Sequence, residues 1–96
     1  QSHSFICEKV SIGKKCFISH GTMFVNDLAK SGKINRNSKQ FKKTTIGNNV
    51  TIGSNSTILP VKISNNIVVG AGSLVTKNLS IKGIYAGNPA KLIRRL

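Results

Sequence analysis

Few residues of this chain can do acid–base chemistry. Among its 96 residues, only Glu8 and Asp27 are acidic, and only His3 and His20 are histidines. A neutral imidazole can accept a proton at physiological pH, so both histidines are candidates for removing a proton from a reacting group. The two carboxylates, with the amide of Asn26, can orient a polar ligand through hydrogen bonds. No grouping has the spacing of metal ligands, so no metal site is predicted.

A repeat of six residues indicates how these side chains are positioned. β-Branched or aromatic residues recur at this step in three runs: Ile6, Ile12, Ile18 and Phe24; Ile46, Ile52 and Ile58; Ile63, Val69 and Val75. Small or apolar residues follow four places later, at Val10, Cys16, Thr22, Val50, Ser56, Ile67 and Ser73. A helix would show a period of about 3.6 and a simple strand a period of about 2. A period of six therefore predicts an all-β solenoid of short buried strands and turns, rather than a run of β-hairpins.

Interruptions of the period divide the predicted single domain. Residues 1–25 and 44–79 are expected to form coils, with the polar, basic segment 26–43 protruding between them as a long loop. One step of the period, at Pro60, is a residue short, and the proline is expected to tighten that corner. Residues 80–96 form a C-terminal tail. Pro89 is favoured at the first position of a helix, so it predicts a short helix that caps the last coil.

Composition excludes several classes of protein. No window approaches the roughly 18 apolar residues of a membrane span, and the first residues lack a signal-peptide pattern. The formal charge is +13, but the basic residues are scattered and no aromatic residues interleave with them, so nucleic acid is not the expected partner. Cys7 and Cys16 lack the spacing of a metal site and are too few for a disulfide framework, which predicts reduced thiols in a cytoplasmic protein.

Three segments resemble the hexapeptide-repeat acyltransferases. IVVGAGSLVTK (67–77) and GNPAKLIRR (87–95) are similar to members that use acetyl-coenzyme A. QSHSFICEKVSIGKKCFISHGTMFVND (1–27) resembles the subgroup that acetylates amino groups of nucleotide-linked amino sugars, such as dTDP-3-amino-3,6-dideoxyhexoses. The resemblance implies a left-handed parallel β-helix, a homotrimer with each active site between two chains, and acetyl-CoA as the donor. The handedness rests on the resemblance alone, because parallel crossovers are usually right-handed.

The family's three-strand coil of about 18 residues implies where the acceptor would bind. His3 and His20 would share one corner of successive coils, and Glu8 would lie over Asn26, beside Asp27. His20 is then the first candidate for the base that takes the amine proton and His3 the second, while the other three would orient the amine and the sugar hydroxyls. The alternatives are that each histidine is only a solvated turn residue, that the amine attacks already deprotonated, and that Asp27 only caps the loop.

The resemblance also implies where coenzyme A would lie. The residues carried over are Ser54, Ala71, Thr76, Lys77, Lys91 and Arg94. Ala71 follows Ser54 by 17 residues, one coil less the missing residue, so both are expected to face one groove. Small residues there let the pantetheine approach the backbone, and the basic residues would meet the phosphates. The alternative is that the basic tail is only solvated charge.

Together these expectations predict an N-acetyltransferase acting on an amino sugar linked to dTDP or UDP. Related O-acetyltransferases commonly carry a catalytic histidine after their loop, whereas TTIGNNVTIG (44–53) has none, which favours transfer to an amine. Two alternatives are retained. One is an O-acetyltransferase acting on a serine or a sugar hydroxyl. The other is a non-catalytic β-helix fragment, because only about three coils remain without the loop and the tail, and repeat proteins usually need at least three repeats for stability.

Overall fold

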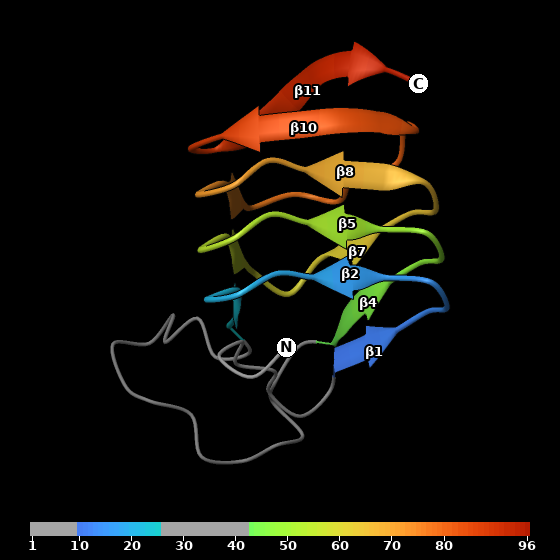
Figure 1. Ribbon diagram of the computed structural model, residues 1–96, viewed down its shortest axis with the longest axis vertical. Helices are drawn as coiled ribbons and strands as arrows, with labels where there is room; N and C mark the ends of the chain where they lie inside the picture. The colour runs from blue at the N-terminus through green and yellow to red at the C-terminus, as the bar shows by residue number, and fades with distance from the viewer. Residues whose placement is uncertain (1–9, 26–42) are drawn as a thin grey trace.

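The chain forms a β-helix of short parallel strands closed by a C-terminal hairpin (Figure 1). The computed structural model describes residues 10–25 and 43–96. The strands are β1 (Val10–Ile12), β2 (Phe17–Ile18), β3 (Met23–Phe24), β4 (Thr44–Ile46), β5 (Thr51–Ile52), β6 (Thr57–Ile58), β7 (Lys62–Ile63), β8 (Ile67–Val69), β9 (Leu74–Val75), β10 (Gly83–Gly87) and β11 (Ala90–Arg95). No helix occurs in these ranges, so none there can span a bilayer.

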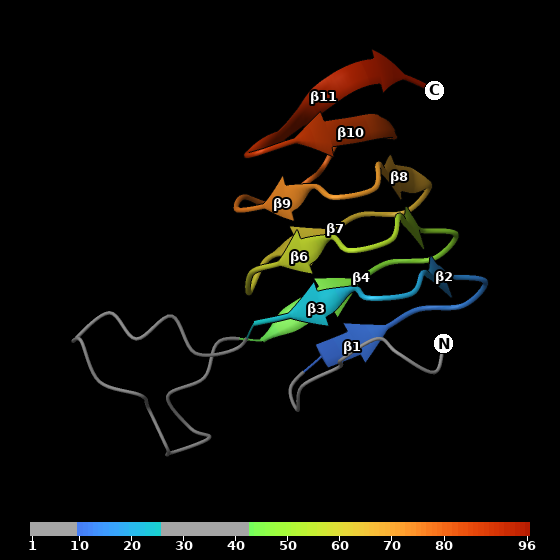
Figure 2. The same cartoon turned by 60° about the vertical axis from the view of Figure 1, so that its left-hand side comes forward.

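The strands stack into three sheets that form the faces of a triangular prism. Face 1 contains β1, β4 and β7; face 2 contains β2, β5, β8, β10 and β11; face 3 contains β3, β6 and β9. Figure 2 shows the strands of face 3 stacked in the order β3, β6 and β9, with β10 and β11 above them. In Figure 1 the chain crosses face 2 from right to left as it rises, which is the left-handed sense. The predicted left-handed parallel β-helix is therefore confirmed.

Backbone pairing between coils determines which residues stack. Thr51 pairs with Phe17 of the coil before and with Val68 of the coil after, 17 positions later. Gly83 pairs with Ile67, 16 positions earlier. The expected coil of 18 residues is thus not found in the described part, because the corner at Pro60 lacks one residue and the corner after Val75 is shorter still.

The six-residue period predicted most of the core, although Ile12 is only partly buried and Val61, Leu79 and Tyr85 were not among its positions. The buried hydrophobic residues are Ile18, Phe24, Ile46, Val50, Ile52, Ile58, Val61, Ile63, Ile67, Val69, Val75, Leu79 and Tyr85. Thr22, Ser56 and Ser73 form an inward column beside them, and each hydroxyl is hydrogen-bonded to a backbone carbonyl. Stacking like on like lets every coil bury its leading side chain on the one below, which compensates for the shortness of the strands.

The C-terminal tail is a β-hairpin, so the predicted short helix is wrong. β10 and β11 pair antiparallel, and Gly87, the last residue of β10, has φ 109° directly before the turn. Pro89 signals only a local preference, whereas the open edge of β10 offers a row of backbone hydrogen-bond partners to residues 90–95. The hairpin takes over the capping role, since Tyr85 of β10 is buried in the core and its hydroxyl donates to the carbonyl of Ile81 at 2.6 Å.

The long loop was predicted between β3 and β4. β1 and β4 are direct neighbours in face 1, so these two strands belong to successive coils. Apart from Lys43, the segment 26–43 lies outside the described residues, and its protrusion stays a prediction. Cys16 carries a free thiol that donates to the Gly47 carbonyl at 3.0 Å, while Cys7 also lies outside the described residues.

Replacing Thr44 by valine should stabilise the protein. The Thr44 hydroxyl is buried in the core and has no hydrogen-bond partner in the described structure. Removing it relieves a desolvation cost, so Thr44→Val is expected to raise the free energy of unfolding by about 1 kcal/mol. Thr22→Val is the matched control. The Thr22 hydroxyl donates to the backbone carbonyl of Ser19 at 2.8 Å, so this change should lower the free energy of unfolding by about 1 kcal/mol. Urea unfolding of both variants measures the difference, and equal losses would contradict the assignment.

Candidate functional site

His20, Ser54 and Ala71 form an outward column at the corner between faces 2 and 3, called here the His20 corner. The pairing of β2, β5 and β8 puts the three at equivalent places in successive coils. The backbone confirms this, because the amide of Asn55 donates to the His20 carbonyl at 3.0 Å and that of Gly72 to the Ser54 carbonyl at 2.8 Å. The predicted neighbour relation of Ser54 and Ala71 is therefore confirmed, and His20 lies in the same column.

The corner is shaped by a second column with left-handed backbone angles. Gly21, Asn55 and Gly72 have φ of 78°, 59° and 70°. Glycine and asparagine tolerate this region better than other residues, so they allow the chain to turn sharply from face 2 into face 3. The turn leaves His20 exposed and turns Thr22 inward. Sequence analysis missed Asn55, although a Gly, Asn or Gly at each equivalent position was a usable signal.

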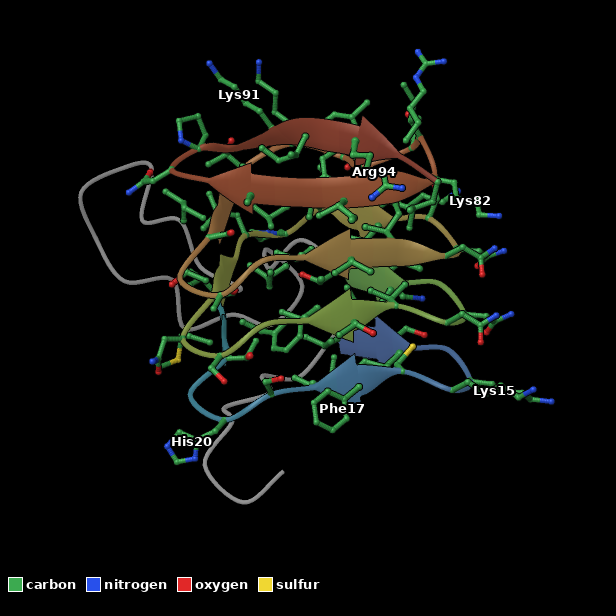
Figure 3. The ribbon with its side chains drawn as sticks, turned by 45° about the horizontal axis from the view of Figure 1, so that its top comes forward. Lys15, Phe17, His20, Lys82, Lys91 and Arg94 are labelled. Atoms are coloured by element: carbon green, nitrogen blue, oxygen red, sulfur yellow. The ribbon has the colours of Figure 1, made fainter. Side chains whose placement is uncertain are left out.

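Half-exposed apolar side chains flank the His20 corner on both sides. The outward row of face 2 runs from Phe17 through Thr51 to Val68, and that of face 3 from Met23 through Thr57 to Leu74. Phe17 is 53% exposed and Met23 44% exposed. In Figure 3, Phe17 lies on the sheet with His20 at its edge. A ligand or a second chain at this corner would meet apolar surface on either side.

β11 brings Lys91 and Arg94 to the outer side of face 2. Two residues three apart in a regular strand point to opposite sides, but the register slips by one residue between Ile84 and Tyr85. Lys91 therefore pairs with Ala86 and Arg94 with Ile84. In Figure 3 Arg94 lies across the strands of this sheet. Lys91 pairs with Ala86, and Ala86 lies next to Gly70, which directly precedes Ala71. Lys91 is therefore near the upper end of the His20 corner.

The structure separates Thr76 and Lys77 from the other predicted cofactor residues. They follow β9 at the corner between faces 3 and 1, called here the Pro60 corner, where the Leu59 amide donates to the Val75 carbonyl at 3.0 Å. The width of face 3 lies between them and Ala71. A single ligand reaches both groups on one chain only by crossing that face.

The remaining predicted site residues lie outside the described part of the chain. These are His3, Glu8, Asn26 and Asp27. Their convergence near His20 stays a prediction. Among residues 10–25 and 43–96, no three or more His, Cys, Asp or Glu side chains gather as metal ligands do.

Comparison with known proteins agrees with this geometry. Residues 43–77 match the family described as the hexapeptide repeat of succinyl-transferase. This match covers β4 to β9, which are part of the region in which the six-residue period and the parallel stacking were found. Residues 43–77 therefore carry the hexapeptide repeat.

Several acyltransferases are similar to this hexapeptide-repeat chain. A probable macrolide acetyltransferase from Lysinibacillus sphaericus is 35% identical over 114 residues, which cover 97% of the chain and 63% of the relative. The solved structure of the polysialic acid O-acetyltransferase OatWY is 35% identical with a TM-score of 0.76, over 96% of this chain and 47% of that one. AntD, an N-acyltransferase from Bacillus cereus in complex with dTDP-4-amino-4,6-dideoxyglucose and coenzyme A, is 25% identical with a TM-score of 0.73. The alignment covers 90% of this chain and 52% of AntD, so this chain spans less than two thirds of each protein named.

Adding a methyl group at Gly53 should disturb the His20 corner. A Cβ at Gly53 would lie 2.5 Å from the amide nitrogen and 2.7 Å from the Cα of Ala71. Since both atoms belong to the backbone, relief requires the coils to move apart, and Gly53→Ala is expected to cost about 1–3 kcal/mol of unfolding free energy. Ser54→Ala, which adds no atoms, should stay within about 0.5 kcal/mol of the parent. Thermal unfolding of both variants tests the packing; a Gly53→Ala protein as stable as the parent would refute it.

Proposed function

We propose that the chain is part of an acetyl-CoA-dependent N-acetyltransferase acting on the amino group of a nucleotide-linked amino sugar. The observation that carries the proposal is the column of His20, Ser54 and Ala71. It places a histidine that can act as a base beside two small residues that leave room for the pantetheine arm of the donor. AntD supports the acceptor class, because a structure of similar fold holds both a dTDP-linked amino sugar and coenzyme A. We place the enzyme in the cytoplasm, where both substrates would be made.

The reaction transfers an acetyl group from a thioester to an amine. The amine nitrogen attacks the thioester carbonyl, a C–N bond forms, and the C–S bond of the tetrahedral intermediate breaks to release the coenzyme A thiolate. His20 takes the proton that the nitrogen loses. Holding amine and thioester together at the corner is worth roughly 7–11 kcal/mol of the barrier. His3 remains the second candidate for the base, with Glu8, Asn26 and Asp27 orienting the acceptor.

The residues present fit a long, anionic donor. Ser54 and Ala71, with Gly53 and Gly72 beside them, leave the backbone of the His20 corner open to close approach by the pantetheine arm. The positive charges on the outer side of β11, Lys91 and Arg94, would meet its phosphates. Thr76 and Lys77, at the other edge of face 3, would contact the same molecule most directly from a neighbouring chain.

A homotrimer would complete this site. The outward rows containing Phe17 and Met23 leave apolar surface on both sides of the His20 corner. Symmetric association covers such surface and adds to the small core of a short chain. Each active site would then lie between two chains, which brings the Thr76 side of one chain towards the Ala71 side of the next.

A panel of acceptors tests the reaction. With acetyl-CoA in each case, thiol release is expected to be fastest with dTDP- and UDP-linked amino sugars, because an amine is the better nucleophile for a site without a histidine after the loop. Neutral sugars, serine and the amino sugars without a nucleotide serve as controls. A hydroxyl acceptor that outpaces every amino sugar would establish the second candidate, an O-acetyltransferase, which the likeness to OatWY favours. No thiol release with any acceptor would favour the non-catalytic fragment.

Replacing His20 by alanine tests its role as the base. General-base removal typically lowers turnover by about 100-fold or more, so His20→Ala should reduce kcat while the KM for acetyl-CoA changes little. Ser80→Ala, at an exposed turn far from the His20 corner, should leave kcat unchanged. Unchanged turnover in His20→Ala would leave His3 or solvent to remove the proton.

A further inference from the structure

Positive charge is distributed unevenly over the described surface. The acids of this sequence, Glu8 and Asp27, both lie outside the described ranges, so the described part of the chain contains lysine and arginine but no aspartate or glutamate. Below β10, faces 2 and 3 and the His20 corner between them contain no lysine or arginine. The cations lie instead on the opposite side of the prism and on β11.

Five lysines define this opposite side, called here the lysine face. They are Lys14, Lys15, Lys43, Lys62 and Lys82, and all are exposed. Lys62 projects from β7, the last strand of face 1, and Lys43 directly precedes β4. The other three lie at the corner between faces 1 and 2, whereas Lys77, at the Pro60 corner, belongs to the proposed coenzyme A site. Figure 3 shows Lys15 and Lys82 along one edge of face 2 and His20 at the other, so the lysine face points away from the proposed acetyl-transfer site.

Uncharged polar side chains fill the spaces between these lysines. At the corner between faces 1 and 2, Asn49 and Asn66 stack between Lys15 and Lys82, since the Asn49 amide donates to the Lys14 carbonyl and the Asn66 amide to the Asn48 carbonyl, both at 2.9 Å. Face 1 adds the hydroxyls of Ser11 and Thr45 in the row that ends at Lys62. No aromatic side chain is found on this side within the described residues.

A second hydrogen-bonded column holds this corner in register. The Asn48 side chain accepts from the Lys14 amide at 2.8 Å, and that of Asn65 accepts from the Asn48 amide at 2.7 Å. These amides clamp the turns to one another, so the lysines above and below are presented from a fixed backbone. Their spacing is set by the coils: Lys15 and Lys82 are three coils apart, or about 14 Å at the usual distance between strands.

From these observations we infer that the lysine face binds an acidic polysaccharide, a flexible polymer with roughly one carboxylate on each sugar. Lysines would pair with the carboxylates, while the serine, threonine and asparagine side chains would hydrogen-bond the sugar hydroxyls between them. The wide spacing of the lysines matches a polymer of low charge density. Duplex DNA carries one charge per about 1.7 Å, which such sparse cations neutralise poorly, and single strands would lack aromatic platforms for their bases.

Binding of polygalacturonate, a carboxylated glycan, tests this inference independently of any acetyl transfer. The triple variant Lys15→Gln/Lys62→Gln/Lys82→Gln should bind it about tenfold more weakly or worse, since each lysine near an anionic surface contributes about 1 kcal/mol before screening. The matched control Lys91→Gln/Arg94→Gln/Arg95→Gln removes the same charge from β11 and should weaken binding less than about threefold. Affinity for the parent protein should fall between about 50 mM and about 300 mM NaCl, and neutral dextran should not bind.

Other outcomes would overturn the inference. Equal losses in the two triple variants would show that net charge, and not the lysine face, attracts the glycan. Tighter binding of oligo(dT), or of vesicles containing phosphatidylglycerol, than of polygalacturonate would assign the face to nucleic acid or to a membrane surface. Failure of the acetyl-transfer assay with intact glycan binding would reject the proposed function and leave this inference standing.

Discussion

The backbone hydrogen bonds between successive coils are the interaction on which the structure depends. Each short strand is bonded to the strand one coil away, as when the Gly53 amide donates to the Val69 carbonyl at 2.7 Å and the Thr57 amide to the Ser73 carbonyl at 2.8 Å. A strand of two or three residues makes too few such bonds to be stable alone. Stacked in register, the strands bury a continuous core of isoleucine and valine, and that core in turn holds the hydrogen bonds away from water.

Register also converts sequence spacing into chemistry. Residues 17 positions apart become neighbours in the second and third coils, so a side chain is positioned by the corner it occupies rather than by its local sequence. Inside the corner, the cost of burying a hydroxyl such as that of Ser56 is offset, because the hydroxyl donates a hydrogen bond to a backbone carbonyl of a neighbouring turn. Outside it, the same repetition produces columns of exposed side chains. The His20 column and the asparagine column at the opposite edge are two results of one constraint.

A triangular section lets one small domain present surfaces of different character. The corner with His20 lies between two half-apolar faces, whereas face 1 and its corners carry lysines and neutral polar groups. Placing the cations away from the apolar rows avoids burying charge if those rows pack against another chain. It also leaves the lysines exposed for an anionic partner. The proposed reaction and the proposed glycan contact therefore occupy separate sides of the prism.

The amino-acid sequence by itself determined the solenoid and most of its inward residues, because a strict local period repeats the same burial demand in every coil. The neighbour relation of Ser54 and Ala71 needed in addition the three-strand coil that the family resemblance implies. The handedness of the β-helix could be predicted only from the family resemblance, and the structure of the C-terminal tail was predicted wrongly. Residues 90–95 became a strand because the edge of β10 was there to pair with, a non-local partner that outweighs the local preference of Pro89. The bulge then decided that Lys91 and Arg94 share a side, and the width of face 3 separates Thr76 from Ala71. These outcomes depend on how turns of unequal length add up in space, which only the tertiary structure reveals.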